Sequence, residues 1–200
     1  MPRGRPKNTE TRRAQIVEGL LEVIASQGYE GATIPAIADA AGIAAGGVHY
    51  HFKTKEHVLL ALTERLVADL AARYERRLAT ATDPCARLDA FINAHLALGS
   101  DADPRAVAAW VAIAAESVRR PAVREAYAAA LHSRLKALRE LCAECLRARQ
   151  GSAQGAAALA AGILAAIEGA YTVAAAAPDA IPRGSAASTV RRMAHASIPD

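Results

Sequence analysis

The sequence predicts an all-α protein of about nine helices, in which a small N-terminal three-helix domain precedes a larger helical bundle. Hydrophobic residues make up 52% of the 200 residues and aromatic residues only 4%. Much of the apolar content is alanine, the strongest helix former. Apolar residues recur at spacings of three and four, as in Ile16, Leu20, Val23 and Ile24. No stretch alternates with the period of two that a half-buried strand shows.

The N-terminal elements follow from local signals. Residues 1–8 are polar and rich in proline and glycine, so they are expected to form a flexible basic arm. Gly28 is expected to end the first helix. Thr33 is a candidate N-cap for a short helix, and Gly42 permits the left-handed turn that follows it. A second short helix runs through Phe52.

The later helices are marked by caps and breakers. Thr54 is expected to cap a long, leucine-rich helix. Asp-Pro pairs at 83–84 and 103–104 each place an N-cap acid before a proline at the first helical position. Three more helices are predicted, at residues 121–149, 156–177 and 185–196.

Charge is concentrated at the N-terminus. The formal net charge is +4, and the first thirteen residues carry Glu10 against Arg3, Arg5, Lys7, Arg12 and Arg13, which accounts for the whole excess. A basic arm on a balanced body suggests a polyanionic partner for the arm. The order Arg-Gly-Arg-Pro resembles the core of an AT-hook, which lies in a narrow minor groove. The alternative is a solvated basic tail.

The cysteines and one apolar segment bear on the compartment. An odd number of cysteines, Cys85, Cys142 and Cys145, suggests no disulfide framework and a reducing cytosol. The mid-helix pair Cys142 and Cys145 is interpreted as core packing in preference to zinc or redox chemistry. No signal peptide is expected. The alanine-rich segment 156–177 contains Glu168, which favours a buried helix at a helical interface over a membrane span.

Two short helices joined by an Ala-Gly turn predict a helix-turn-helix. Ile37, Val48 and Phe52 are expected to face the core. The outer face then carries Ala44, Ala45, Gly46, Gly47, His49, Tyr50, His51, Lys53 and Lys55. Small residues followed by rings and cations suit a helix whose N-terminal end enters a major groove while the rings and lysines reach phosphates.

A metal site is the main alternative for the histidines. His49 and His51 are two residues apart, which separates them by about 200° around a helix, so they cannot share one ion. His57 belongs to the next helix, and no aspartate or cysteine nearby supplies the missing ligands. We therefore expect no metal. Solvated histidines without a role remain a further alternative.

Residues 12–66 resemble the TetR family of transcriptional regulators through "AAGI" and "GGVHYHFKTKE", with a leucine-rich helix behind. The resemblance implies that the second short helix is the recognition helix and that His49, Tyr50 and His51 contact DNA. It also implies phosphate binding by Lys55 and by the cap Thr33. Ala44 and Gly47 depart from the hydroxyl residues common in the family, which leaves direct base readout open.

The second half resembles the choline-responsive repressors of betaine synthesis, which implies a ligand-binding and dimerisation domain. Pocket candidates are the polar or aromatic residues that interrupt apolar faces: Phe91, His95, Trp110, Glu116, Tyr127, Glu168 and Tyr171. For each of them, plain packing or exposure is the alternative. Small residues Gly162, Ala166 and Gly169, together with the last helix, are expected to form a twofold dimer interface.

The expected segments are the arm at 1–8, the helix-turn-helix domain at 9–53, a connecting helix at 54–82 and the ligand-binding and dimerisation domain at 83–200. We expect a cytoplasmic homodimer that binds a palindromic operator, responds to a small-molecule effector, lacks enzymatic activity and needs no cofactor or membrane. The alternatives are an architectural binder of A·T-rich DNA without an effector and a helical carrier or enzyme.

Overall fold

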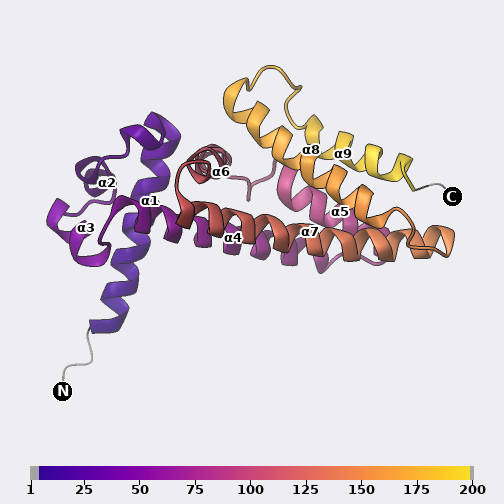
Figure 1. The fold of residues 1–200 in the computed structure, drawn as a ribbon, viewed down its shortest axis with the longest axis horizontal. Helices are drawn as coiled ribbons and strands as arrows, with labels where there is room; N and C mark the ends of the chain where they lie inside the picture. Colours follow the sequence, from indigo (N-terminus) through magenta and orange to yellow (C-terminus); the bar gives the residue numbers. More distant parts are fainter. Residues whose placement is uncertain (1–4, 199–200) are drawn as a thin grey trace. The chain divides into compact units, whose positions relative to one another are not determined.

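The predicted all-α class and the predicted number of helices are confirmed. In a computed structural model, which describes residues 5–198, those residues form nine helices and no strand (Figure 1). The helices are α1 (Arg5–Gly31), α2 (Ile34–Ala40), α3 (Ala45–His51), α4 (Lys55–Leu78), α5 (Pro84–Leu96), α6 (Pro104–Ser117), α7 (Pro121–Gln150), α8 (Ala156–Ala176) and α9 (Ser185–Ala196).

The chain divides into two compact units. Unit 1 comprises residues 1–66 and 103–127, and unit 2 comprises residues 67–102 and 128–200. Helices α4 and α7 each begin in unit 1 and continue into unit 2. The expected domain at 83–200 therefore draws residues from both units, and its functional role remains a prediction.

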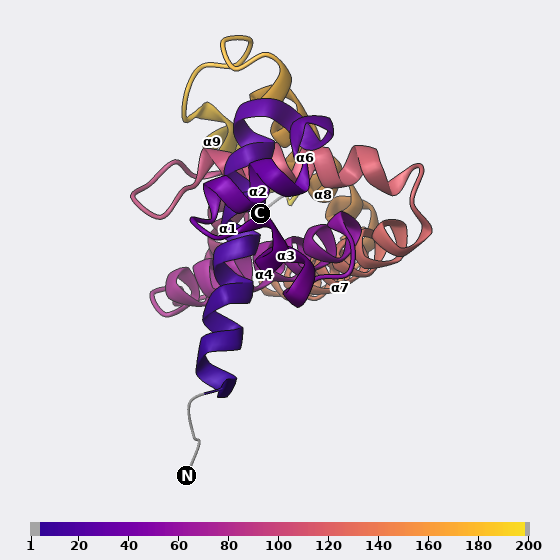
Figure 2. The same cartoon turned by 90° about the vertical axis from the view of Figure 1, so that its left-hand side faces the viewer.

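Unit 1 is built on a close approach between α1 and α2. A Cβ atom at Gly19 would lie 2.7 Å from the carbonyl oxygen of Ile37 and 2.9 Å from the amide nitrogen of Ala41. Glycine is therefore the residue that allows α2 to pack at this distance. Figure 2 views the unit from the side of α2 and α3, which lie together against α1.

The predicted helix ends are confirmed at the caps. The Thr33 hydroxyl accepts a hydrogen bond from the Ala36 amide at 3.2 Å. The carboxylates of Asp83 and Asp103 accept from the amides two or three residues ahead, each at 2.9 Å. Gly28 breaks the helical backbone with φ 73° and ψ 174°, as expected, although α1 ends three residues later, at Gly31. Gly42 takes φ 64° in the turn before α3.

The start of α1 differs from the expected flexible arm. The helix already begins at Arg5, so residues 5–8 are helical and not extended. Proline is tolerated in a first helical turn, and adding a turn to an existing helix costs far less than nucleating one. Pro6 is therefore compatible with this extension. Arg3 lies outside the described residues.

Unit 2 contains α5, α8 and α9, which contact one another, and the remainder of α4 and α7 (Figure 1). Leu88, Ile92, Leu138 and Ile167 are fully buried in it. Only 28% of the most apolar window of α8 is buried. Among the described residues, α8 is the one helix long and apolar enough to cross a membrane, and that test is also met by helices of soluble proteins. The expected burial of α8 at an interface is thus incomplete within a single chain.

The expectation of no disulfide is wrong. Cys85 near the start of α5 and Cys145 near the end of α7 are bonded, with their Cα atoms 4.7 Å apart. Sixty residues separate the two cysteines, so no local spacing in the sequence predicts the bond. Cys142 is a buried free thiol, as the core-packing interpretation expected, and burial raises its pKa to about 11.

The close approach at Gly19 predicts an asymmetry between two glycine substitutions. Gly19→Ala should lower the free energy of unfolding by about 1–3 kcal/mol, because the added methyl group meets backbone atoms. Gly46→Ala is the control, because a Cβ there meets nothing within 4 Å. It should leave stability unchanged or raise it by up to about 1 kcal/mol. Urea denaturation followed by circular dichroism measures both, and equal effects would contradict the packing described.

The disulfide predicts a redox-dependent stability. Reduction should lower the free energy of unfolding by about 4 kcal/mol, because a closed loop of 60 residues is released in the unfolded chain. Urea denaturation with and without a phosphine reductant measures the change. Cys142→Ala should retain the response and Cys85→Ala should abolish it. A wild-type protein indifferent to reductant would argue against the bond.

Candidate functional site

Buried apolar side chains and one cation hold helix α3 in place. Val48 is fully buried and Phe52 is 4% exposed. The Arg13 guanidinium donates a hydrogen bond to the carbonyl oxygen of His51 at 2.7 Å and lies 4.0 Å above the Phe52 ring. A cation near a helix C-terminus is stabilising, because the last carbonyl groups lack partners within the helix. Arg13 therefore fixes the end of α3.

The outer face of α3 is open to solvent. The predicted DNA-binding residues there are Ala44, Ala45, Gly46, Gly47, His49, Tyr50, His51 and Lys53, all exposed except Gly47 and His51, which are half-buried. Tyr50 is 77% exposed and meets the His51 ring edge-on at 5.0 Å between centroids. No side chain caps the start of α3. The structure thus brings these residues onto one short helix and its flank.

Lys55 does not point freely outward. Its ammonium group donates to the carbonyl oxygen of Tyr29 at 3.0 Å and lies 4.1 Å above the Tyr29 ring. Desolvation by burial lowers the pKa of Lys55. Phosphate binding by this residue, which stays a prediction, requires its ammonium group to leave that contact.

The histidines of α3 gain no ligand partners from the fold. In the described part of the chain, no group of three or more histidine, cysteine or acidic residues is placed to hold a metal ion. The Nδ1 atom of His57 instead lies 3.2 Å from the hydroxyl oxygen of Thr54. The same hydroxyl caps α4, as predicted, by accepting from the His57 amide at 3.2 Å.

Four of the predicted pocket residues lie in unit 2. The rings of Phe91 and His95 stack with centroids 4.3 Å apart, and the Tyr74 ring meets Phe91 edge-on at 5.4 Å. The Tyr171 hydroxyl, which is buried, donates to the carbonyl oxygen of His95 at 3.2 Å. Glu168 pairs with Arg134 at 2.8 Å, so the carboxylate that the sequence placed in an apolar helix has its partner inside the protein.

The His95 ring is almost completely buried, at 4% exposure. Its Nδ1 atom is 2.8 Å from the carbonyl oxygen of Phe91. Desolvation lowers the pKa of His95 to about 3, and the nearby cations Arg134 and Arg73 act in the same direction. The imidazole is therefore neutral at physiological pH.

The other pocket candidates belong to unit 1. Trp110 and Tyr127 form a ring pair with centroids 5.0 Å apart. The Glu116 carboxylate accepts from Arg120 Nε at 2.7 Å, and Arg120 also pairs with Glu56 at 3.3 Å. These contacts tie α6, α7 and the start of α4 together within the unit.

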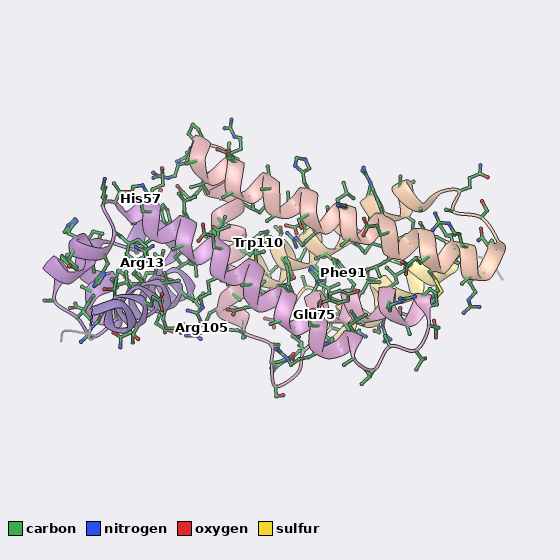
Figure 3. The ribbon with its side chains drawn as sticks, turned by 90° about the horizontal axis from the view of Figure 1, so that it is seen from below. Arg13, His57, Glu75, Phe91, Arg105 and Trp110 are labelled. Carbon is green, nitrogen blue, oxygen red and sulfur yellow. A yellow bond between two sulfur atoms is a disulfide. The ribbon has the colours of Figure 1, made fainter. Side chains whose placement is uncertain are left out.

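One connecting residue, Arg105, was not evident from the sequence. Its guanidinium donates to Glu18 at 2.9 Å and Glu22 at 3.0 Å on α1, and it also pairs with Asp103. Arg105 is labelled in Figure 3. Glu18 pairs in addition with Arg65 of α4 at 2.5 Å. One carboxylate thus joins α1, α4 and α6. More than 80 residues separate Arg105 from its partners on α1, so no helical spacing reveals them.

Two family models match this chain. The model for bacterial regulatory proteins of the tetR family matches residues 16–62, and the model for the C-terminal part of BetI-type transcriptional repressors matches residues 84–199. The second covers more than half of the chain. The chain belongs to the TetR family. Its C-terminal half is of the BetI type, so both resemblances drawn from the sequence are confirmed.

Named relatives agree with this TetR-family assignment. Over 116 residues the chain is 34% identical to the HTH-type transcriptional regulator BetI of Paraburkholderia phymatum and to that of Burkholderia mallei strain NCTC 10229. Each match spans 58% of this chain and 59% of the relative.

Solved structures of other regulators share the fold. A transcriptional regulator from Rhodococcus sp. Rha1 superimposes with a TM-score of 0.79 at 24% identity, over 93% of this chain and 95% of the other. A putative regulator from Saccharomonospora viridis in complex with choline gives 0.76 at 25% identity, over 94% and 96%.

The buried imidazole predicts acid sensitivity in this TetR-family protein. Below about pH 6.5 the His95 imidazole is protonated in the unfolded chain, whereas in the folded protein it stays neutral down to about pH 3. The free energy of unfolding therefore falls as the pH is lowered across this interval. His95→Phe should flatten the pH dependence there. The same change at His132, an exposed residue of α7, should not, because that side chain stays in water on folding. The test is the midpoint of urea denaturation, measured from pH 3.5 to 7.5. Parallel pH curves for His95→Phe and wild type would contradict the lowered pKa of His95.

Proposed function

We propose that this TetR-family chain is a ligand-responsive repressor that binds a palindromic operator as a homodimer and releases it when a small effector binds. The supporting observation is the exposed outer face of α3, fixed by Val48, Phe52 and Arg13 on a helix-turn-helix. It acts by binding and not by catalysis, and it works in the cytoplasm without a cofactor or a membrane.

DNA contact in this proposal divides between the two ends of α3. Ala44–Gly47 enter the major groove, where small side chains allow close approach and Ala45 can meet a thymine methyl group. His49, Tyr50, His51 and Lys53 reach phosphates on the groove walls, as does Thr33 at the N-cap of α2. Arg3 and Arg5 extend the contact toward the minor groove.

The homodimer in this proposal forms through α8 and α9. A Cβ at Gly162 or Gly169 would meet nothing within 4 Å, so the face of α8 that carries these two glycines points away from its own chain. Met193 on α9 is 59% exposed. Small residues let two helices approach closely, and a twofold pair of such faces would complete the burial that α8 lacks within one chain.

The effector in this proposal binds in the BetI-type half. The S. viridis protein carries choline, and the 34% identical relatives are named BetI regulators, although the match spans only 59% of their length. Binding favours one of two conformations only through a difference in affinity for them. Helices α4 and α7, which run from unit 1 into unit 2, are continuous routes for such a shift.

Operator binding tests the proposal. The intergenic DNA next to the gene is searched for an inverted repeat, and fluorescence anisotropy compares that repeat, a single half-site and shuffled DNA at physiological salt. We expect the full repeat to bind at least about 1,000-fold more tightly than shuffled DNA. Equal affinities would support an architectural binder instead. No binding to any DNA would point to a helical carrier or enzyme.

Lys53 predicts a change in salt dependence. Lys53→Gln should weaken binding to every DNA sequence and reduce the magnitude of the slope of log K against log salt by about two for the homodimer, because one phosphate contact is lost from each of its two subunits. Lys136→Gln removes the same charge from an exposed site on α7 in unit 2 and serves as the control. Titrations at four salt concentrations measure both slopes. An unaltered slope for Lys53→Gln removes this residue from the interface.

A further inference from the structure

The buried ring of His95 has one nitrogen occupied and one unused. The Nδ1 atom lies 2.8 Å from the Phe91 carbonyl oxygen, which can only accept a hydrogen bond. Nδ1 must therefore carry the proton, and in the neutral ring Nε2 is then an acceptor. Within residues 5–198, Nε2 is shielded from solvent and meets no hydrogen-bond partner.

Donors close to this ring are engaged elsewhere. The Tyr171 hydroxyl donates to the main-chain oxygen of His95 and not to its ring. The Arg134 guanidinium pairs with Glu168, and Arg73 pairs with Asp101 and donates to the Ala97 carbonyl oxygen. A buried acceptor without a donor destabilises a fold, so its retention calls for a partner from outside the chain.

The surroundings of Nε2 select among possible donors. Arg73 and Arg134 both disfavour positive charge at the imidazole. An ammonium donor placed at Nε2 would meet the same repulsion, whereas a neutral hydroxyl would not. The stacked Phe91 ring and the adjoining Tyr74 ring provide apolar surface beside the acceptor. A hydroxyl group on an apolar or aromatic body matches these features.

We propose that His95 Nε2 accepts a hydrogen bond from a neutral hydroxyl group of the effector, so that the effector is a small alcohol or phenol. This assignment rests on the proposed function for the existence of an effector and adds its chemical class. It makes His95 a residue that discriminates between ligands. An ether of the same size, which offers no donor, would leave Nε2 unpaired when bound.

Two matched pairs of probes test the hydroxyl requirement directly. Choline is compared with its O-methyl ether, and phenol with anisole, on the full chain labelled with nitrogen-15 at histidine. The Nε2 resonance of His95 reports its hydrogen bonding, and the exposed His132 is the internal reference. We expect at least one alcohol to shift the His95 resonance and to bind about threefold to tenfold more tightly than its ether. If neither alcohol shifts it, or if each ether shifts it as strongly, the proposal is overturned.

His95→Phe provides the second measurement, because it keeps a ring against Phe91 and removes the acceptor. The variant should bind each alcohol and its ether with equal affinity. A preference for the alcohol that survives in this variant would move the acceptor to another residue. Operator binding, measured separately, distinguishes the two levels of the argument. A protein that binds its operator but shows no His95 shift contradicts this inference alone. A protein that shows the shift but binds no operator contradicts the proposed function, and the hydroxyl site at His95 then stands without the role of an effector site.

Discussion

The contact between Gly19 of α1 and the backbone of α2 is the constraint on which the helix-turn-helix depends. A Cβ atom at residue 19 would lie 2.7 Å from the Ile37 carbonyl oxygen, so any residue other than glycine would displace α2. The position of α2 sets the turn at Gly42, and the turn sets the direction of α3. Arg13 then closes the end of α3 from the same helix α1. One long helix thus fixes both ends of the candidate recognition element.

A second set of contacts joins this element to the rest of unit 1. Glu18 pairs with Arg65 of α4 and Arg105 of α6, and Arg120, which directly precedes α7, pairs with Glu116 of α6 and Glu56 of α4. These side chains are partly exposed, so each pair alone contributes little to stability. Their value lies in geometry, because a shared carboxylate keeps three helices in register. A shift in α4 or α6 would therefore be felt by α1 and, through α1, by α3.

Local physics explains what the sequence could reveal. The caps at Thr33, Asp83 and Asp103 and the turn at Gly42 depend on residues within three or four positions, and the structure has them as predicted. Apart from the helical start of α1, the errors concern long-range partners. The disulfide joins residues 60 apart, and the contact of Lys55 with Tyr29 spans 26. Glu168 was selected as a pocket candidate, but its pairing with Arg134 could not be predicted, because helical periodicity does not say which helices meet.

The glycines of α3 show that the fold and the proposed function place different demands on the same helix. Neither Gly46 nor Gly47 has a positive φ, and a Cβ at Gly46 would meet nothing within 4 Å. Neither turn geometry nor packing therefore requires glycine at Gly46, although glycine weakens a helix by about 0.5–1 kcal/mol relative to alanine. Within the proposed function, the reason lies on the DNA side, where a bare backbone can approach the groove floor. Recognition then relies on thymine methyl groups and DNA shape, because few side chains remain at that end to read base edges.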